Sequence, residues 1–263
     1  MATKPDFLND SAVPFRYLQS TGITDVNTII SDVRSELVTN STWTEPSTAL
    51  FKSPPDSAGK FFDILLTKIA ATNLEIRLRD YRGATLYTRR IQIDATASVN
   101  YFTNTRGICI ESLRATSEVA SAYLLETTPD LLADVDNRLV GTTLRSTADT
   151  VDGAGGTMTV FFAFDAGAAT NGNRCWACSN DAAGLVTMIN GSATLVYRPH
   201  WVAINQSGTR RYTGRPYHAL VGDAASLTFG TDKTIPLGDG TTGTFRVIGL
   251  TTTNNKRLLL RKA

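Results

Sequence analysis

The clearest hydrophobic pattern in the chain lies between residues 24 and 40. Five apolar residues recur there at spacings of three and four: Val26, Ile29, Ile30, Val33 and Leu37. This spacing places them on one face of an α-helix. Thr24 or Asp25 is suited to cap the start of the helix, and Asn40 to end it. The pattern therefore predicts one amphipathic helix near the N-terminus.

A second pattern, alternation with period two, covers residues 73–93. Leu74, Ile76 and Leu78 alternate with Glu75, Arg77 and Arg79. Residues 80–83, Asp-Tyr-Arg-Gly, have the composition of a hairpin turn, and Gly83 is placed where the backbone must relax. Apolar markers recur in the return segment 84–93, so these residues predict a β-hairpin whose two faces differ in polarity.

The flanking segments give weaker signals. Residues 43–95 as a whole are typical of an antiparallel β-module, with a turn-rich cluster at 52–59. Within 101–126, Ile108 and Ile110 alternate as in a strand, whereas 117–125 fits either a helix or a strand. Pro129 in a first turn, apolar residues through Leu139 and Gly141 as a C-cap predict a short helix over 129–139.

The chain changes character near residue 150. Residues 142–156 are polar and glycine-rich, which indicates a linker. Beyond them we expect short strands and turns, including a hairpin at Asn190-Gly191. The expected strands cover residues 158–164, 185–189, 193–197, 201–204, 219–221, 226–229 and 244–250.

Together these patterns predict a mainly β chain with a few helices (α+β), built from antiparallel β-sandwich or barrel-like modules. An N-terminal helix and extended terminal arms complete the expected fold. Three units are expected: an arm and helix at 1–42, a β-rich module with a short helix at 43–150, and a Thr/Gly-rich β-module at 151–263.

Both chain ends carry candidate docking residues. The N-terminal segment places Phe7, Phe15 and Tyr17 among prolines, without a regular period. Such an apolar arm either packs on its own domain or docks on a neighbouring subunit. The C-terminal residues 256–262 are basic around a run of three leucines, and are a second candidate arm.

Composition narrows the class of protein. The chain has 263 residues, with 26 basic and 24 acidic side chains, for a net charge of +2. This balance argues against a DNA-coating protein and against an acidic disordered tail. No apolar run approaches the roughly 20 residues of a bilayer span, and no signal-peptide pattern is visible. Threonine makes up about one residue in seven, which favours β-structure.

Motifs for catalysis are missing from the sequence. His200 and His218 are the only histidines, and both have surroundings typical of structural residues. No nucleophile elbow, zinc-protease motif or P-loop is present, because Gly59-Lys60 is followed by Phe61. We therefore expect a protein that is not an enzyme, with no catalytic residues and no cofactor.

The cysteines leave three alternatives open. Cys175 and Cys178 form a C-x-x-C pair, with Cys109 elsewhere in the chain. The pair can be coincidental, half of a zinc site, or a redox motif. No second close pair completes a zinc site, so no metal site is predicted.

Two basic groups stand out. Arg77, Arg79, Arg89 and Arg90 belong to the predicted hairpin, and Arg210, Arg211 and Arg215 are interleaved with tyrosines. Arginine suits protein interfaces because its planar fork pairs with carboxylates. A solvated sheet face and nucleic-acid binding are the alternatives, and nucleic acid is the least favoured partner. The predicted interface residues are Phe7, Phe15, Tyr17, Arg77, Arg79, Arg89, Arg90, Arg210, Arg211 and Arg215.

The segment from Phe51-Lys52-Ser53-Pro54 through Gly59-Lys60-Phe61-Phe62-Asp63, the hairpin that follows it and the Thr/Gly-rich tail together resemble virion structural proteins of tailed bacteriophages. The resemblance implies a non-enzymatic subunit of a symmetric particle, assembled in the bacterial cytoplasm and placed at the neck or baseplate end of the tail. Its partners would be copies of itself and other virion proteins, with no membrane partner.

Rival interpretations remain. Trp176, Trp201, Tyr212 and Tyr217 are suited to line a shallow sugar site, which would make the chain a receptor- or carbohydrate-binding module. A capsid decoration protein is a further alternative, although such a protein would usually be shorter and more self-contained.

Overall fold

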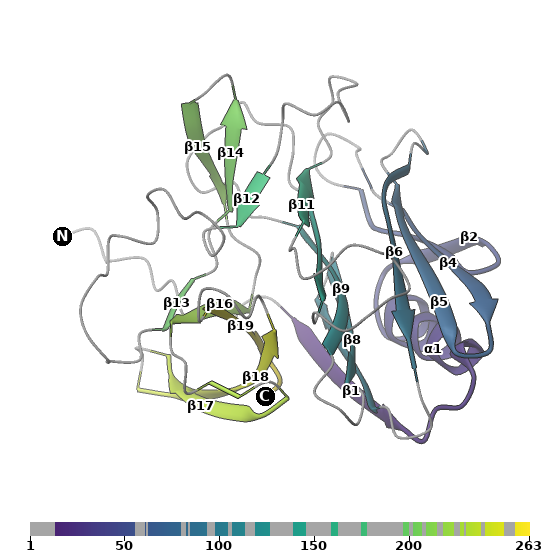
Figure 1. Cartoon of the computed structure of the whole chain (residues 1–263), viewed down its shortest axis with the longest axis horizontal. Helices are drawn as coiled ribbons and strands as arrows, with labels where there is room; N and C mark the ends of the chain where they lie inside the picture. Colours follow the sequence, from purple (N-terminus) through teal and green to yellow (C-terminus); the bar gives the residue numbers. More distant parts are fainter. Residues whose placement is uncertain are drawn as a thin grey trace.

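The computed structural model describes residues 14–55, 61, 63–79, 83, 85–93, 98–104, 107–113, 119–126, 139–145, 159–162, 175–177, 197–199, 202–206, 209–214, 218–223, 227–228, 230–237, 240–249 and 256–263. These residues hold nineteen β-strands and one α-helix, and the strands form four antiparallel sheets. The expected mainly β fold is confirmed (Figure 1).

The N-terminal helix forms where its apolar spacing predicts. Helix α1 (Val26–Arg34) starts at Asp25, whose carboxylate accepts a hydrogen bond from the Asn27 N–H at 2.8 Å. It continues as a π-helical turn, Ser35–Thr39, in which the Asn40 N–H donates to the Ser35 carbonyl at 2.9 Å. The apolar face is buried, and only the π-helical turn was not predicted.

A five-stranded N-terminal sheet follows the helix. Its strands run in the order β2 (Thr44–Ser47), β3 (Leu50–Lys52), β4 (Asp63–Ala70), β5 (Asn73–Arg79) and β6 (Thr85–Gln92). The predicted hairpin is confirmed as β5 and β6, and Gly83 in the connection has φ +82°. Leu74 and Ile76 are buried, as the alternation requires.

The six-stranded central sheet crosses two of the predicted unit boundaries. Its order is β1 (Phe15–Thr21), β7 (Ser98–Asn104), β8 (Gly107–Leu113), β9 (Val119–Glu126), β10 (Leu139–Arg145) and β11 (Thr159–Phe162). Strand β1 comes from the predicted arm and β11 from the predicted third unit, so the boundaries at 42 and 150 do not separate sheets.

Strand β10 corrects two predictions. Leu139 and Gly141 were expected at the end of a helix, and residues 142–145 in a linker. All of them lie in β10, between β9 and β11. The β-branched Thr142 and Thr143 favour the strand, and pairing on both sides satisfies its backbone. The remainder of the predicted helix and linker, residues 129–138 and 146–156, lies outside the described residues.

The C-terminal part contains two further sheets. The five-stranded C-terminal sheet has the order β13 (Tyr197–Pro199), β16 (Ala219–Asp223), β19 (Lys256–Arg261), β18 (Thr242–Gly249) and β17 (Asp232–Pro236). A small sheet has the order β12 (Cys175–Ala177), β14 (Val202–Gln206) and β15 (Thr209–Gly214). The hairpin expected at Asn190-Gly191 lies outside the described residues.

The expectation of extended terminal arms is wrong for the described ends of the chain. Strand β1 pairs along its full length with β7, and the basic strand β19 lies between β16 and β18 at the centre of its sheet. Strand β19 therefore has backbone pairing on both edges, and the edge strand β1 on one edge, so neither segment extends away from the chain as an arm. Residues 1–13, which include Phe7, lie outside the described residues.

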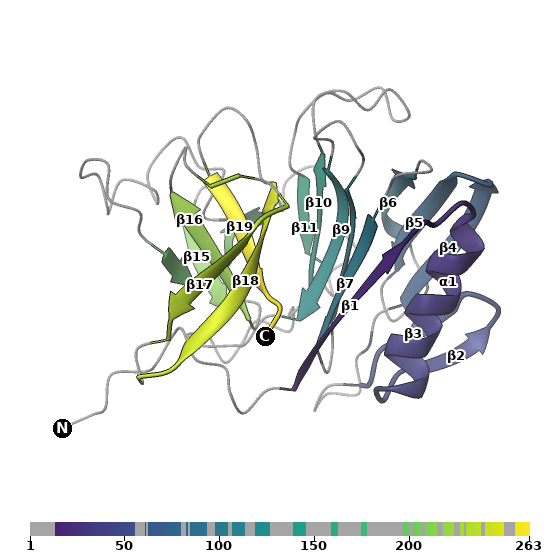
Figure 2. The ribbon, with the colours of Figure 1, turned by 90° about the horizontal axis from the view of Figure 1, so that it is seen from below.

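The sheets form layers around the central sheet (Figure 2). One of its faces, bearing Val99, Tyr101, Ile108 and Ile110, packs with α1 and the N-terminal sheet in a single hydrophobic core. Its opposite face contacts the C-terminal sheet, which has a second core of its own. The N-terminal sheet consequently turns one face inward to the core and the other outward.

Candidate protein-interaction surface

The predicted arginine stripe lies on the outward face of the N-terminal sheet. Ile64, Ile76 and the other core residues of β4 and β5 occupy the inward face. Strand alternation therefore places Asp63, Glu75, Arg77 and Arg79 outward, and the strand register sets Arg90 of β6 directly opposite Glu75. We call these five residues (Asp63, Glu75, Arg77, Arg79 and Arg90) the arginine face.

The arginine face is held by ion pairs within the chain. Glu75 forms an ion pair with each of two arginines. Nη2 of Arg77 lies 2.6 Å from Oε1 of Glu75, and Nε of Arg90 lies 3.3 Å from Oε2. Asp63 lies 3.5 Å from Nη2 of Arg79, across the β4–β5 pair. Three of the predicted interface residues are thus brought together by two acidic neighbours.

On the arginine face, the acidic side chains are buried and the basic side chains are more exposed. The Glu75 side chain is 5% exposed, whereas Arg77 is 43% and Arg90 37% exposed. Asp63 is likewise buried beside a more exposed Arg79. Because the carboxylates lie beneath the guanidinium groups, this face presents cations to its surroundings although acids hold it in place.

Apolar side chains border these cations. Leu50 and Leu65 occupy the register row of Arg77 and are half-buried. Ile69 is 48% exposed, but it lies at a register shift in β4, so alternation does not assign it to this face. Lys52 lies opposite Asp63, with its ammonium nitrogen 3.6 Å from the centre of the Phe61 ring. Arginine beside apolar surface is the composition that protein interfaces favour.

The remaining predicted arginines do not join this face. Arg89 is opposite Ile76, so its position in β6 belongs to the inward side of the sheet. Arg210 and Arg211 lie in β15, the last strand of the small sheet, and as adjacent residues they belong to opposite faces of it. Arg215 lies outside the described residues.

Phe15 and Tyr17 are engaged inside the chain, where the central and C-terminal sheets meet. The Phe15 ring lies 4.7 Å from the ring of the buried His218 and beneath the guanidinium of Arg261. Tyr17 packs against Phe102 and donates its hydroxyl hydrogen bond to Asn100 Oδ1 at 2.7 Å. For these two residues, the structure supports packing on the chain's own domain.

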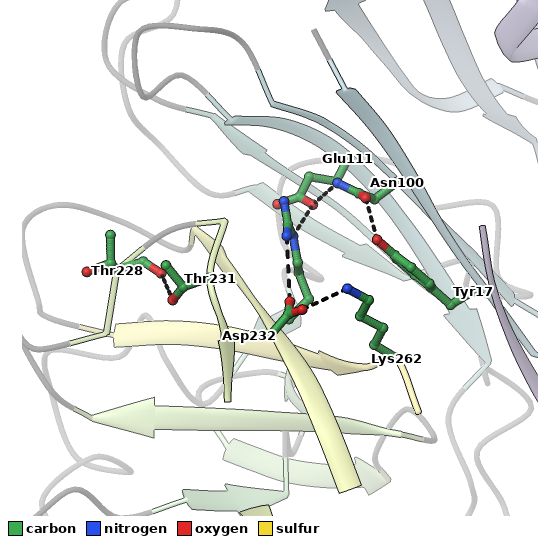
Figure 3. Close-up of polar contacts among 8 residues, drawn as sticks. Tyr17, Asn100, Glu111, Thr228, Thr231, Asp232 and Lys262 are labelled. Atoms are coloured by element: carbon green, nitrogen blue, oxygen red, sulfur yellow. Dashed lines mark hydrogen bonds and ion pairs between the residues drawn. The ribbon is translucent and has the colours of Figure 1, made fainter. Parts of the chain in front are cut away.

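A buried polar network joins the two sheets at this junction (Figure 3). Asn100 donates to Glu111 Oε2 at 2.8 Å, and Arg246 Nε donates to the same oxygen at 3.2 Å. Arg246 also lies 3.6 Å from Asp232, which pairs with Lys262 at 2.7 Å. Sequence reasoning missed this network, because Glu111 and Arg246 are 135 residues apart.

Burial shifts the acid–base properties of groups near the junction. It raises the pKa of Glu111, against the opposing effect of Arg246. Burial also raises the pKa of the Cys109 thiol, with a further contribution from Glu111. A buried cysteine with a raised pKa is a poor nucleophile, so Cys109 contributes packing rather than reactivity.

The described residues hold neither a cluster of metal ligands nor a helix that could span a membrane. No group of three His, Cys, Asp or Glu side chains there is arranged to hold a metal ion. Cys175 lies in β12, whereas Cys178 and His200 are outside the described residues. Within the described residues, no helix has the length and apolar character needed to cross a bilayer.

Comparison with known proteins gives no assignment: neither a protein-family model nor a curated protein sequence matches this chain.

Proposed function

We propose that the chain is a non-enzymatic structural subunit of a tailed-bacteriophage particle, placed in the tail at its neck or baseplate end. It acts through contacts with copies of itself and with other virion proteins. The observation that carries this proposal is the arginine face, where exposed guanidinium groups lie over buried carboxylates beside apolar side chains. Such a surface is suited to contacts with another protein rather than to catalysis.

The way the acidic side chains are used supports the same proposal. Glu36, Glu45, Glu75 and Glu111 each accept an arginine from another part of the chain. Each of these ion pairs ties its carboxylate to another part of the chain, and the Arg34 guanidinium also lowers the pKa of Glu45. These four glutamates therefore serve the architecture of the described part of the chain.

The proposal is tested by purifying tailed-phage particles from a host that produces this chain and analysing them by mass spectrometry. We expect the chain in a fixed, repeated copy number, and ring-shaped oligomers of the purified chain in electron micrographs. A chain that remains a monomer and is absent from intact particles would contradict the proposal.

A carbohydrate-binding module is the second candidate. The register of the small sheet places Trp176 of β12 and Tyr212 of β15 on either side of Ala203 in β14. The two aromatic positions therefore share one face, roughly 10 Å apart across a small residue. A glycan array tests this candidate: binding that Trp176→Ala abolishes would favour it, and an array without signal would count against it.

A further inference from the structure

The arginine face carries more cations than it displays acids. Its two carboxylates are buried beneath Arg77, Arg79 and Arg90, and Lys52 adds a fourth cation in the row of Asp63. A partner approaching this face therefore meets guanidinium and ammonium groups. Charge complementarity requires that the partner supply carboxylates or phosphates.

The buried acids also prepare the arginines for binding. Glu75 engages Arg77 through Nε at 2.7 Å and Arg90 through Nε at 3.3 Å, which fixes both side chains. A guanidinium has five N–H donors, and one carboxylate engages at most two of them. Each arginine consequently keeps donors for a partner, and less side-chain entropy is lost on binding because the geometry is already set.

The apolar neighbours distinguish between carboxylates and phosphates as the complementary group. Leu50 and Leu65 lie half-buried in the row of Arg77. A nucleic-acid backbone offers no apolar side chains to cover these residues, whereas a protein surface does. The mixture of fixed arginines and apolar side chains therefore fits a protein.

We propose that the arginine face binds an acidic protein surface on which carboxylates are interleaved with apolar or aromatic side chains. This inference rests on the proposed function, since it names the chemistry of the neighbouring subunit. The carboxylates of the partner accept hydrogen bonds from the remaining N–H donors of Arg77 and Arg90, and its apolar side chains cover Leu50 and Leu65.

Binding of defined polymers by the isolated full chain tests the inference. Fluorescence anisotropy compares three probes: a random copolymer of glutamate and tyrosine, polyglutamate, and an oligothymidylate of similar charge. We expect the copolymer to bind most tightly, with an affinity that weakens as salt concentration rises. Arg77→Gln and Lys52→Gln should each weaken copolymer binding by about two- to fivefold.

A matched control separates this face from general positive charge. Arg16 is 51% exposed and lies 2.9 Å from the buried Glu36, so it repeats the same pairing on β1, away from the arginine face. Arg16→Gln should leave copolymer binding unchanged. In Arg77→Gln, Glu75 keeps Arg90 as a partner, and a thermal melt verifies that each variant is folded.

Three results would overturn the inference: equal or tighter binding of oligothymidylate, an equal loss in Arg16→Gln, or no copolymer binding by the unchanged chain. The first of these would assign the face to nucleic acid. Because the assay uses the isolated chain, its failure leaves the presence of the chain in phage particles as a separate question.

Discussion

On two sheet faces of this chain, arginine lies over a buried glutamate, but the surroundings of the two pairs differ. At the junction, Arg246 over Glu111 is covered by packing between the central and C-terminal sheets and is only 8% exposed. On the arginine face, Arg77 and Arg90 over Glu75 have the same chemistry but remain over one-third exposed.

This difference shows what a covered arginine face looks like. At the junction the C-terminal sheet carries Arg246 and, directly opposite it on the neighbouring strand, the carboxylate of Asp232. Arg246 meets Glu111 of the central sheet, and Tyr17 of β1 contacts the nearby Lys262. The partner proposed for the arginine face brings the same two kinds of group, carboxylates and aromatic side chains. One arginine–glutamate pairing is therefore covered within the chain, whereas the pairing on the arginine face stays open to solvent.

The largest effect is expected from Arg246→Ala. The substitution leaves Glu111 buried without its nearest counter-charge, which should lower the free energy of unfolding by about 3–5 kcal/mol. Urea denaturation followed by circular dichroism measures this loss. A loss below about 1 kcal/mol would mean that water reaches the Arg246–Glu111 pair, which would then be no more buried than the ion pairs of Glu75.

A smaller loss is expected from Tyr17→Phe, by about 1–3 kcal/mol, because it leaves the buried Asn100 Oδ1 without its hydroxyl donor. Tyr101→Phe is the matched control. The Tyr101 hydroxyl donates a hydrogen bond to Asp32. In the variant Asp32 keeps a 2.7 Å hydrogen bond from Ser20, so the free energy of unfolding should fall by about 1 kcal/mol or less. Equal losses in the two variants would contradict a dry junction.

The pH dependence of stability should reveal Glu111. Burial raises its pKa in the folded state, so the folded chain binds a proton more readily than the unfolded chain. Its contribution to the free energy of unfolding is therefore greatest below the unfolded pKa of about 4.3 and falls as pH rises to the folded pKa.

The Glu111→Gln variant isolates this contribution from other carboxylates. Pairing with Lys68 and Arg34 lowers the pKa of Asp25 and of Glu45, so these groups stabilise the fold above their pKa and act in the opposite direction. The free energy of unfolding of the unchanged chain, minus that of the variant, should fall as pH rises, by at most about 1.4 kcal/mol per pH unit. A difference that rises with pH would show that Arg246 outweighs burial.

The smallest effect is expected from Arg77→Ala, at about 1 kcal/mol or less. Arg77 is solvent-screened, and Glu75 keeps Arg90 in the variant. The same denaturation experiment as for Arg246→Ala measures it. A loss comparable to that of Arg246→Ala would place Arg77 among the residues required for folding rather than for contacts.

Local sequence patterns predicted the arginine face but not the junction. Period-two alternation of residues 73–79 places Arg77 and Arg79 on one face, and the pairing of β5 with β6 brings Arg90 beside them. The burial of Glu75 could not be predicted, because it depends on the register of β6 and on Arg90 lying directly opposite.

The C-terminal sheet was the hardest part to anticipate. Strand β19 combines three consecutive leucines with flanking basic residues, so it lacks the alternation of a half-buried strand. Its neighbours β16 and β18 supply the pairing, and β19 is central because both of its edges are used. The Glu111–Arg246 contact then joins sheets that no local pattern connects.

Arginine footprinting with phenylglyoxal, read by mass spectrometry on the free chain and on intact particles, tests the central comparison most directly. We expect Arg77 and Arg90 to be modified in the free chain and protected in the particle, and Arg246 to be protected in both. Equal modification of Arg77 and Arg90 in both samples would contradict this expectation.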